Sequence, residues 1–108
     1  MLTKEELPEC PVATTVQLIG NKWKLLLIRN LIYNGKQRFS DFIKTLPVIS
    51  KKVLTDNLRA LEKDGLVERQ VFAEVPPRVE YSLSPLGNSL RPIIDAMAEW
   101  GTEYKSNL

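Results

Sequence analysis

The chain has 108 residues, of which 44% are hydrophobic and 26% charged, so its length and composition predict a single globular domain over residues 1–108. One cysteine and no histidine exclude an internal disulfide, a Cys/His metal site and a Ser-His or Cys-His catalytic pair, and we expect no cofactor. The N-terminus has no secretory segment and the longest apolar runs are far shorter than a membrane span of ~20 residues, so we expect a cytoplasmic protein without a membrane partner.

The net charge of +2 conceals an uneven distribution along the chain. Residues 20–60 contain nine Lys or Arg and two Asp, a local net charge of +7. A single lysine on a helix is usually only solvated. A middle segment this basic in a nearly neutral chain favours an anionic partner.

The first predicted elements are two helices, over residues 11–19 and 22–34. Pro11 opens the first helix and Gly20 ends it, whereas the second ends at Asn34-Gly35. The second helix is apolar on nearly every side, which predicts that it forms the centre of the core.

Two amphipathic helices follow. The first has Ser40 as its expected N-cap, is ended by Pro47, and carries a one-sided apolar stripe of Phe39, Phe42, Ile43 and Leu46. The second is expected to start at Ser50 as its N-cap, to extend to Asp64-Gly65, and to bury Leu54, Leu58 and Leu61. A pair of short amphipathic helices joined by a tight turn is typical of a helix-turn-helix.

The outer face of the second helix, over residues 50–64, carries the strongest functional signal. With the leucines inward, the helical period turns Lys51, Lys52, Thr55, Asp56 and Arg59 outward. Cations in the first half of a helix oppose its dipole, and a phosphate-facing role explains that placement. Asp56 either accepts a hydrogen bond from cytosine N4 or, as we favour, orients Lys52 or Arg59.

A β-hairpin is predicted after the helix pair, with strands over residues 67–73 and 79–83. Pro76 and Pro77 cannot continue the ladder, so residues 74–78 form a stiff tip that holds out Arg78. This order predicts an α+β, mainly α fold, a winged helix-turn-helix with a two-stranded wing. Arg78 is then expected on the DNA backbone or in the minor groove, although it could also be an ordinary solvated charge.

The C-terminal segment reads as one long helix that Ser84 caps and Pro85 opens. Its apolar positions recur at heptad-like spacings and, together with Ile94, are Leu86, Leu90, Ile93, Met97, Trp100 and Tyr104. This face could pack on its own domain. We favour a homodimer built on Leu90, Ile93, Ile94, Met97, Trp100 and Tyr104, with the N-terminal helix contributing.

Four segments resemble the HxlR-type transcriptional regulators, a winged-helix family related to the MarR group: CPVATTVQLIGNKWKLLLI, RFSDF, LPVISKKVLTDNLRALEKDGLVER and EVPPRVEYSLSPLG. The resemblance covers about residues 10–104. It implies a dimeric bacterial or archaeal repressor or activator on a palindromic operator. It also implies that Ser50 to Arg59 lie on the recognition helix and Arg78 in the wing, and that electrophiles or oxidants sometimes act through a cysteine just before the first helix.

Two functions stay open at this point. The first is a sequence-specific regulator that binds double-stranded DNA through Ser50, Lys51, Lys52, Thr55, Arg59 and Arg78; the second is a protein-interaction module whose basic face meets an acidic partner. An enzyme is not expected, because no nucleophile has a base.

The only cysteine, Cys10, precedes Pro11 at a helix start, where free N–H groups favour a thiolate. Cys10 is therefore either a sensor or a small apolar residue at the dimer seam. Without a second cysteine, its oxidation can end only as a link between subunits, a mixed disulfide with a small thiol, or over-oxidation.

Overall fold

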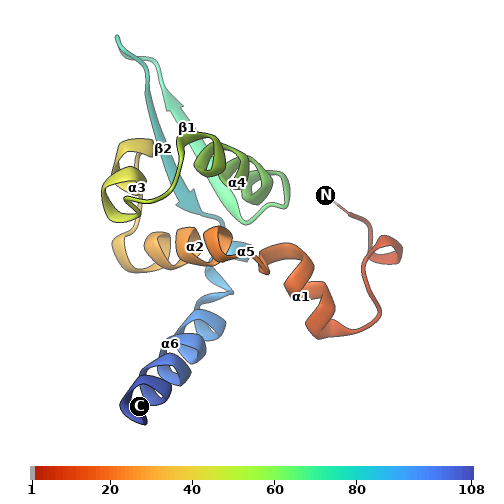
Figure 1. Ribbon diagram of the computed structural model, residues 1–108. Helices are drawn as coiled ribbons and strands as arrows, with labels where there is room; N and C mark the ends of the chain where they lie inside the picture. The colour runs from red at the N-terminus through yellow and green to blue at the C-terminus, as the bar shows by residue number, and fades with distance from the viewer. Residues whose placement is uncertain (1) are drawn as a thin grey trace.

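The computed structural model describes residues 2–108 (Figure 1). After a short 3₁₀ turn at Lys4–Glu6, its elements follow the predicted order closely. They are α1 (Pro11–Ile19), α2 (Lys22–Asn34), α3 (Phe39–Thr45), α4 (Lys51–Lys63), β1 (Val67–Phe72), β2 (Arg78–Leu83), α5 (Pro85–Asn88) and α6 (Arg91–Ser106). The predicted winged helix-turn-helix, mainly helical with a two-stranded antiparallel sheet, is confirmed. No helix among the described residues has both the length and the hydrophobicity needed to cross a membrane.

The core forms around α2, as its nearly uniform hydrophobicity predicts. Its buried side chains include Leu27, Ile28 and Leu31. The inner stripe of α4 packs onto them, and Phe42 from α3 and Val67 from β1 complete the same buried cluster. In Figure 1 the helix pair α3 and α4 and the hairpin lie on one side of α2, while α6 leaves from the other side. The helix-turn-helix therefore rests on a shared, fully buried base.

The N-terminal ends of α3 and α4 are fixed by different residues. Ser50 accepts a hydrogen bond from the Val53 N–H at 3.1 Å, which confirms it as the N-cap of α4. The expectation for α3 is wrong, because Ser40 lies inside the helix and Arg38 is the N-cap. The Asp41 carboxylate accepts the Arg38 N–H at 2.8 Å. A carboxylate in the first turn is also attracted to the positive end of the helix dipole, a favourable interaction that an uncharged serine hydroxyl does not provide.

The hairpin pairs β1 with β2 in a register that runs from Val67↔Leu83 to Phe72↔Arg78. Arg78 is thus the first residue of β2 and not part of the tip, which corrects its predicted place. The loop before α3 adds a bridge that the sequence does not signal. Gln37 and Tyr81 exchange both backbone hydrogen bonds, at 2.9 and 2.8 Å. This bridge joins the hairpin to the helix-turn-helix.

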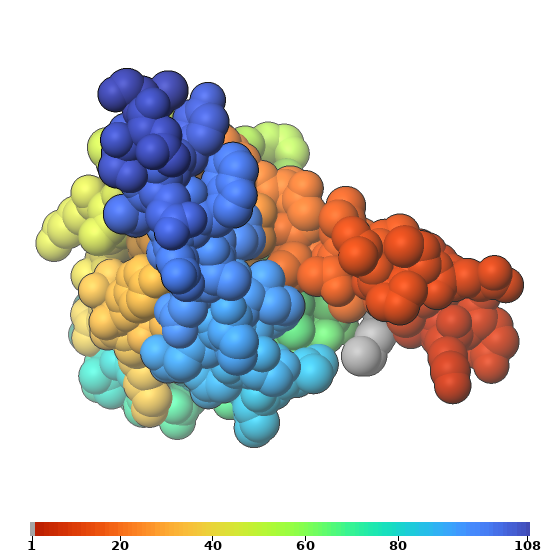
Figure 2. Space-filling view, turned by 90° about the horizontal axis from the view of Figure 1, so that it is seen from below, coloured from red at the N-terminus to blue at the C-terminus, as the bar shows by residue number. Residues whose placement is uncertain are grey.

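The single C-terminal helix predicted from Ser84 is two helices. Ser84 caps only the short α5, accepting the Gly87 N–H at 3.0 Å. A continuous helix would need an N–H at Pro92 to donate to the Asn88 carbonyl, and proline has none. The chain therefore turns at Leu90, and α6 begins at Arg91. Figure 2, seen from below, shows α6 on the side turned to the viewer while α1 and the N-terminal segment extend to one side.

Candidate nucleic-acid interface

The structure places the predicted polar residues of α4 on its outer side. Lys51, Lys52 and Arg59 are exposed and Thr55 is half-buried. These four residues are called the basic face of α4 below. The opposite side is formed by three leucines that are at most 1% exposed, Leu54, Leu58 and Leu61. The buried stripe fixes how the helix is rotated, so the basic face is held in one orientation.

The cations of the basic face differ in their partners. Lys52 Nζ lies 2.6 Å from Asp56 Oδ2, one helical turn away, and both side chains are exposed. Asp56 is therefore in place to orient Lys52, the reading favoured from the sequence. Within residues 2–108, no carboxylate oxygen lies within 4.0 Å of Lys51 or Arg59. These two cations carry their full charge toward solvent.

Arg78 is half-buried and held by its own hairpin. Its guanidinium carbon lies 3.9 Å from the centre of the Phe72 ring, its cross-strand partner. Its terminal nitrogens lie 3.4 Å from Glu74 and 3.3 Å from Glu80. The prediction that the tip holds Arg78 out into solvent is therefore wrong. Two carboxylates and an aromatic ring hold its side chain against the hairpin.

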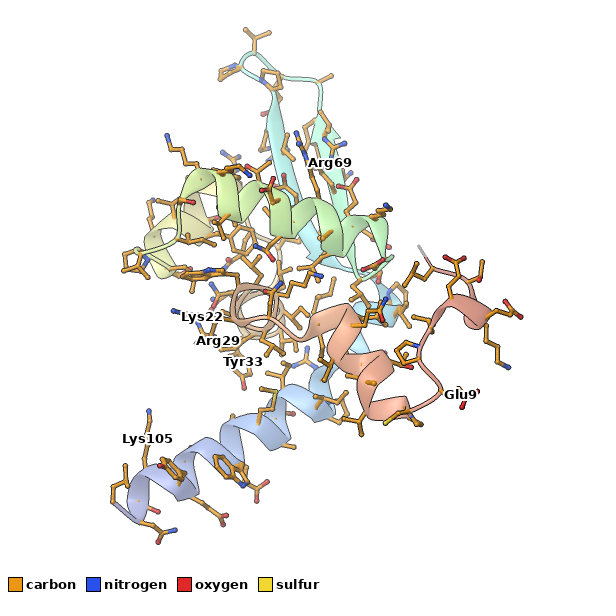
Figure 3. The ribbon with its side chains drawn as sticks, turned by 45° about the vertical axis from the view of Figure 1, so that its right-hand side comes forward. Glu9, Lys22, Arg29, Tyr33, Arg69 and Lys105 are labelled. Atoms are coloured by element: carbon orange, nitrogen blue, oxygen red, sulfur yellow. The ribbon has the colours of Figure 1, made fainter. Side chains whose placement is uncertain are left out.

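A recess between α4 and the hairpin contains residues that the sequence did not single out. It has a volume of about 210 Å³ and is lined by Thr55, Leu58, Arg59, Glu62, Arg69 and Tyr81. We call it the corner recess. Arg69 and Tyr81 are cross-strand partners on one face of the hairpin, and both line the recess beside α4. Figure 3 shows Arg69 at the junction between the hairpin and α4. The signal that could have found them is strand alternation, because Arg69 follows the buried Val67 by two residues.

Charge inside the corner recess is organised around Arg69. Arg69 Nε lies 3.4 and 3.3 Å from the two carboxylate oxygens of Glu62. Partial burial raises the pKa of the Tyr81 phenol, and the positive charges of Arg69 and Arg59 partly oppose that rise. The Tyr81 hydroxyl therefore remains a neutral hydrogen-bond donor at physiological pH.

The apolar residues of α6 divide between core and surface. Ile94 is only 5% exposed and belongs to the core cluster, so it is not available to a partner, which corrects its place among the predicted dimer residues. Leu90 is half-buried against the same cluster. The remaining predicted residues are exposed apolar side chains: Ile93, Met97, Trp100 and Tyr104. Trp100 is 68% exposed and stacks on Tyr104 with ring centres 5.4 Å apart.

Cys10 lies at the N-cap of α1, where its carbonyl accepts the Thr14 N–H at 3.0 Å. Its side chain is exposed in the single chain, so the thiol is open to solvent. On the outer side of α1, Val12 and Val16 are exposed as well. Both elements that the sequence assigns to a dimer therefore present uncovered apolar side chains.

Comparison with known proteins gives the family. The chain is 45% identical over 106 residues to YdeP of Bacillus subtilis, an uncharacterised HTH-type transcriptional regulator, covering 98% of this chain and 82% of that protein. An HTH-type transcriptional regulator of Methanothermobacter thermautotrophicus is 48% identical over 98 residues, which are 91% of this chain and 74% of that protein. The solved structure of the redox regulator HypR in its oxidised form has a TM-score of 0.82 and 47% identity, covering 87% of this chain and 96% of that one.

A family model described as HxlR-like helix-turn-helix matches residues 18–108. The family and these relatives are regulators of transcription and not enzymes. The chain therefore belongs to the HxlR-like helix-turn-helix family of transcriptional regulators.

Proposed function

We propose that this regulator binds a palindromic operator as a homodimer, with α4 in the major groove and the wing, residues 74–78, beside it on the backbone or in the minor groove. The observation that carries the proposal is the basic face of α4, which is exposed and held by three buried leucines. An α-helix with its side chains has a diameter of about 10–12 Å, which matches the width of the major groove, ~12 Å. Lys51 and Arg59 then meet phosphates or base edges without first leaving a carboxylate.

Dimerisation is supported by uncovered apolar surface on α6 and α1. Trp100 and Val12 are 68% and 70% exposed, and Met97, Tyr104 and Val16 are about half exposed. Large apolar side chains grouped in this way mark an interaction surface. A two-fold dimer presents two recognition helices, so the half-sites of its operator lie about one helical turn apart, or a multiple of it. As a regulator that acts on DNA, the protein would work in the cytoplasm of a bacterial or archaeal cell.

The test is selection of bound fragments from random DNA by the purified protein, followed by footprinting and sedimentation. We expect a two-fold symmetric site, a dimer at micromolar concentration and an affinity that falls steeply with salt. A protein that stays monomeric, or that binds all DNA alike, contradicts this proposal. Binding only to an acidic protein would support instead the interaction-module reading of the same basic face.

We further propose that an electrophile or oxidant regulates operator binding through Cys10. Its thiol is exposed at the start of α1, beside the apolar surface assigned to the dimer, and a solved relative is described as a redox regulator. Modification can shift α1 against the partner and change the spacing of the two recognition helices. A link between two Cys10 residues needs Cα atoms within about 7 Å.

The measurement is operator affinity before and after diamide or a quinone, for the native protein and for Cys10→Ser. We expect a change in the native protein alone. Unchanged affinity of a native protein whose Cys10 is modified, as judged by mass spectrometry, removes the sensor role and leaves the DNA-binding proposal intact.

A further inference from the structure

We propose that the corner recess is a seat for one phosphate group, and that in the DNA complex this group is a backbone phosphate at the edge of the major groove. The inference rests on the proposed function, because it assumes that α4 enters that groove. It goes beyond it by assigning a binding role to Arg69 and Tyr81, two hairpin residues outside the basic face of α4.

The position of the corner recess matches a backbone phosphate better than a base. Thr55 and Arg59 reach it from the outer side of α4, and Arg69 and Tyr81 reach it from the hairpin face that turns toward α4. A helix in the major groove directs its outer side at base edges and has a sugar-phosphate strand along its flank. The junction between α4 and the hairpin lies on that flank.

The volume of the corner recess suits a small hydrated anion. At about 210 Å³ it has room for several groups the size of water, each of about 30 Å³. A phosphate group can therefore enter while the rest of the nucleotide stays outside.

The donors that line the corner recess are those that phosphate requires. Glu62 holds Arg69 through Nε, and within residues 2–108 both hydrogen bonds of the Arg69 guanidinium are made by that nitrogen. Its terminal N–H groups are thus left for a ligand, in a fork that matches phosphate geometry. Arg59 adds a second guanidinium without a carboxylate within 4.0 Å among the described residues. Thr55 and Tyr81 add neutral hydroxyl donors.

The charge balance also favours an anion. Two arginines face one glutamate, so the lining carries a net positive charge. Glu62 fixes the side chain of Arg69 in place at the cost of part of this charge. The entropy lost when Arg69 is ordered is therefore lost on folding and not on binding, which is how preorganised sites gain affinity.

The test uses the operator found by selection, in which single phosphates are replaced in turn by neutral methylphosphonates. With the native protein, we expect one position in each half-site to cost about tenfold in affinity because a charge-assisted contact is lost. Arg69→Gln should lose about as much operator affinity, and the slope of log affinity against log salt concentration should become shallower by about one unit per half-site. Replacing that same phosphate should then cost Arg69→Gln clearly less affinity than it costs the native protein, because only Arg59 and the two hydroxyls still contact it.

Two further variants separate a contact from a fold defect. Tyr81→Phe keeps the ring that packs edge-on against Phe42, with centres 6.1 Å apart, but removes the hydroxyl, and we expect a loss of about threefold. Arg91→Gln makes the same charge change at an exposed position outside the corner recess, and it should leave the phosphate scan unchanged. Circular dichroism and urea unfolding of each variant confirm that the fold is intact.

A titration with inorganic phosphate shows whether the occupant of the corner recess is a DNA backbone phosphate or a free anion. If phosphate at constant ionic strength binds the native protein tightly in the absence of DNA and does not bind Arg69→Gln, the seat is supported but its occupant is a free anion. If the native protein selects its operator and Arg69→Gln and Tyr81→Phe bind it with native affinity and phosphate scan, the seat is overturned while the proposed function stands. If the native protein selects no operator, the proposed function fails. The phosphate titration then decides alone, and no binding overturns the seat.

Discussion

Helix α4 and the hairpin both carry cations, but they hold them in different ways. On α4, Lys51 and Arg59 have no carboxylate within 4.0 Å in the described part of the chain. In the hairpin, Arg69 is held by Glu62 at 3.3 Å, and Arg78 by Glu74 and Glu80 at 3.4 and 3.3 Å. A free cation brings its whole charge to a phosphate, whereas a paired one arrives already oriented and partly neutralised.

The two elements differ in this way because they differ in support. The rotation of α4 is fixed by buried leucines, so its outer side chains have no structural duty. A two-stranded hairpin has little stability of its own, and cross-strand pairs supply part of it. Phe72 and Arg78 form such a pair next to the turn of the hairpin. In the proposed DNA interface, α4 would therefore supply charge and the hairpin arginines would supply geometry.

The largest effect is expected from a substitution in the buried core that supports both α4 and the hairpin. Leu54→Ala deletes a fully buried side chain under α4 and should lower the free energy of unfolding by about 2–5 kcal/mol. Urea unfolding measures the loss. Because α4 packs on β1 as well as on α2, the helix and hairpin signals should disappear in one transition. Two separate transitions would mean that the hairpin does not depend on α4.

A second prediction compares the cations within α4. Arg59→Ala should weaken operator binding by about 1–3 kcal/mol whether Arg59 contacts the seated phosphate or a base edge, and only a base contact would also relax the base preference at that position. Lys51→Ala should lower the salt slope by about one unit per half-site. Lys52→Ala should change the slope less, because Asp56 already neutralises part of its charge. Equal slopes for the two lysine variants, measured from 50 to 200 mM salt, would show that the Asp56 pair opens on DNA.

Arg78→Ala tests the hairpin side of the comparison. Loss of the Phe72 contact and of two partly exposed ion pairs should cost about 1 kcal/mol of stability without unfolding the protein. Operator affinity should fall less than in Arg59→Ala, and the salt slope should stay near its native value. A slope lowered by a full unit would mean that Arg78 leaves its glutamates and binds phosphate.

The smallest effect concerns pH. Partial burial raises the pKa of Tyr81 above its unfolded value of about 10, so the native state keeps this proton longer than the unfolded chain. The associated stability is therefore fully present below pH ~10 and is lost as pH rises through the native pKa. Unfolding at pH 8 to 11 should show a steeper decline for the native protein than for Tyr81→Phe. Identical declines would mean that the phenol is solvated.

The fold was largely predictable because its signals are local. The leucine stripe of α4, the cap at Ser50 and the paired prolines each act within a few residues, and the structure has the helix, the N-cap and the turn at those places. Pro92 is also a local signal, for the break between α5 and α6 at Leu90. The regular apolar spacing across this break favours one continuous helix instead. Periodicity describes which residues are apolar and does not test whether every backbone N–H exists.

The candidate site was less predictable because it depends on pairs that are distant in sequence. The prolines just before Arg78 are typical of an exposed turn. Only the strand register brings Phe72, six residues earlier, against its guanidinium. The corner recess likewise needs α4, β1 and β2 to be placed together before Arg59, Arg69 and Tyr81 become neighbours. Ile94 is separated from the exposed residues of α6 only by how that helix docks on α2.

The turn between α5 and α6 gives the C-terminal helix the properties of a lever arm. Beyond Ile94 and up to the end of α6, the side chains on its outer side are exposed to solvent. The whole helix has 16 residues and is about 24 Å long. A rotation of about 10° at the Leu90 turn carries the far end through about 4 Å, from the length that such a helix has. In the proposed dimer, where the exposed Tyr104 lies near that end, a small angular change at the base becomes a displacement of one DNA-binding unit relative to the other. The displacement grows with the length of the helix. Shortening α6 by one turn would therefore reduce both the displacement and the apolar surface available to the proposed dimer.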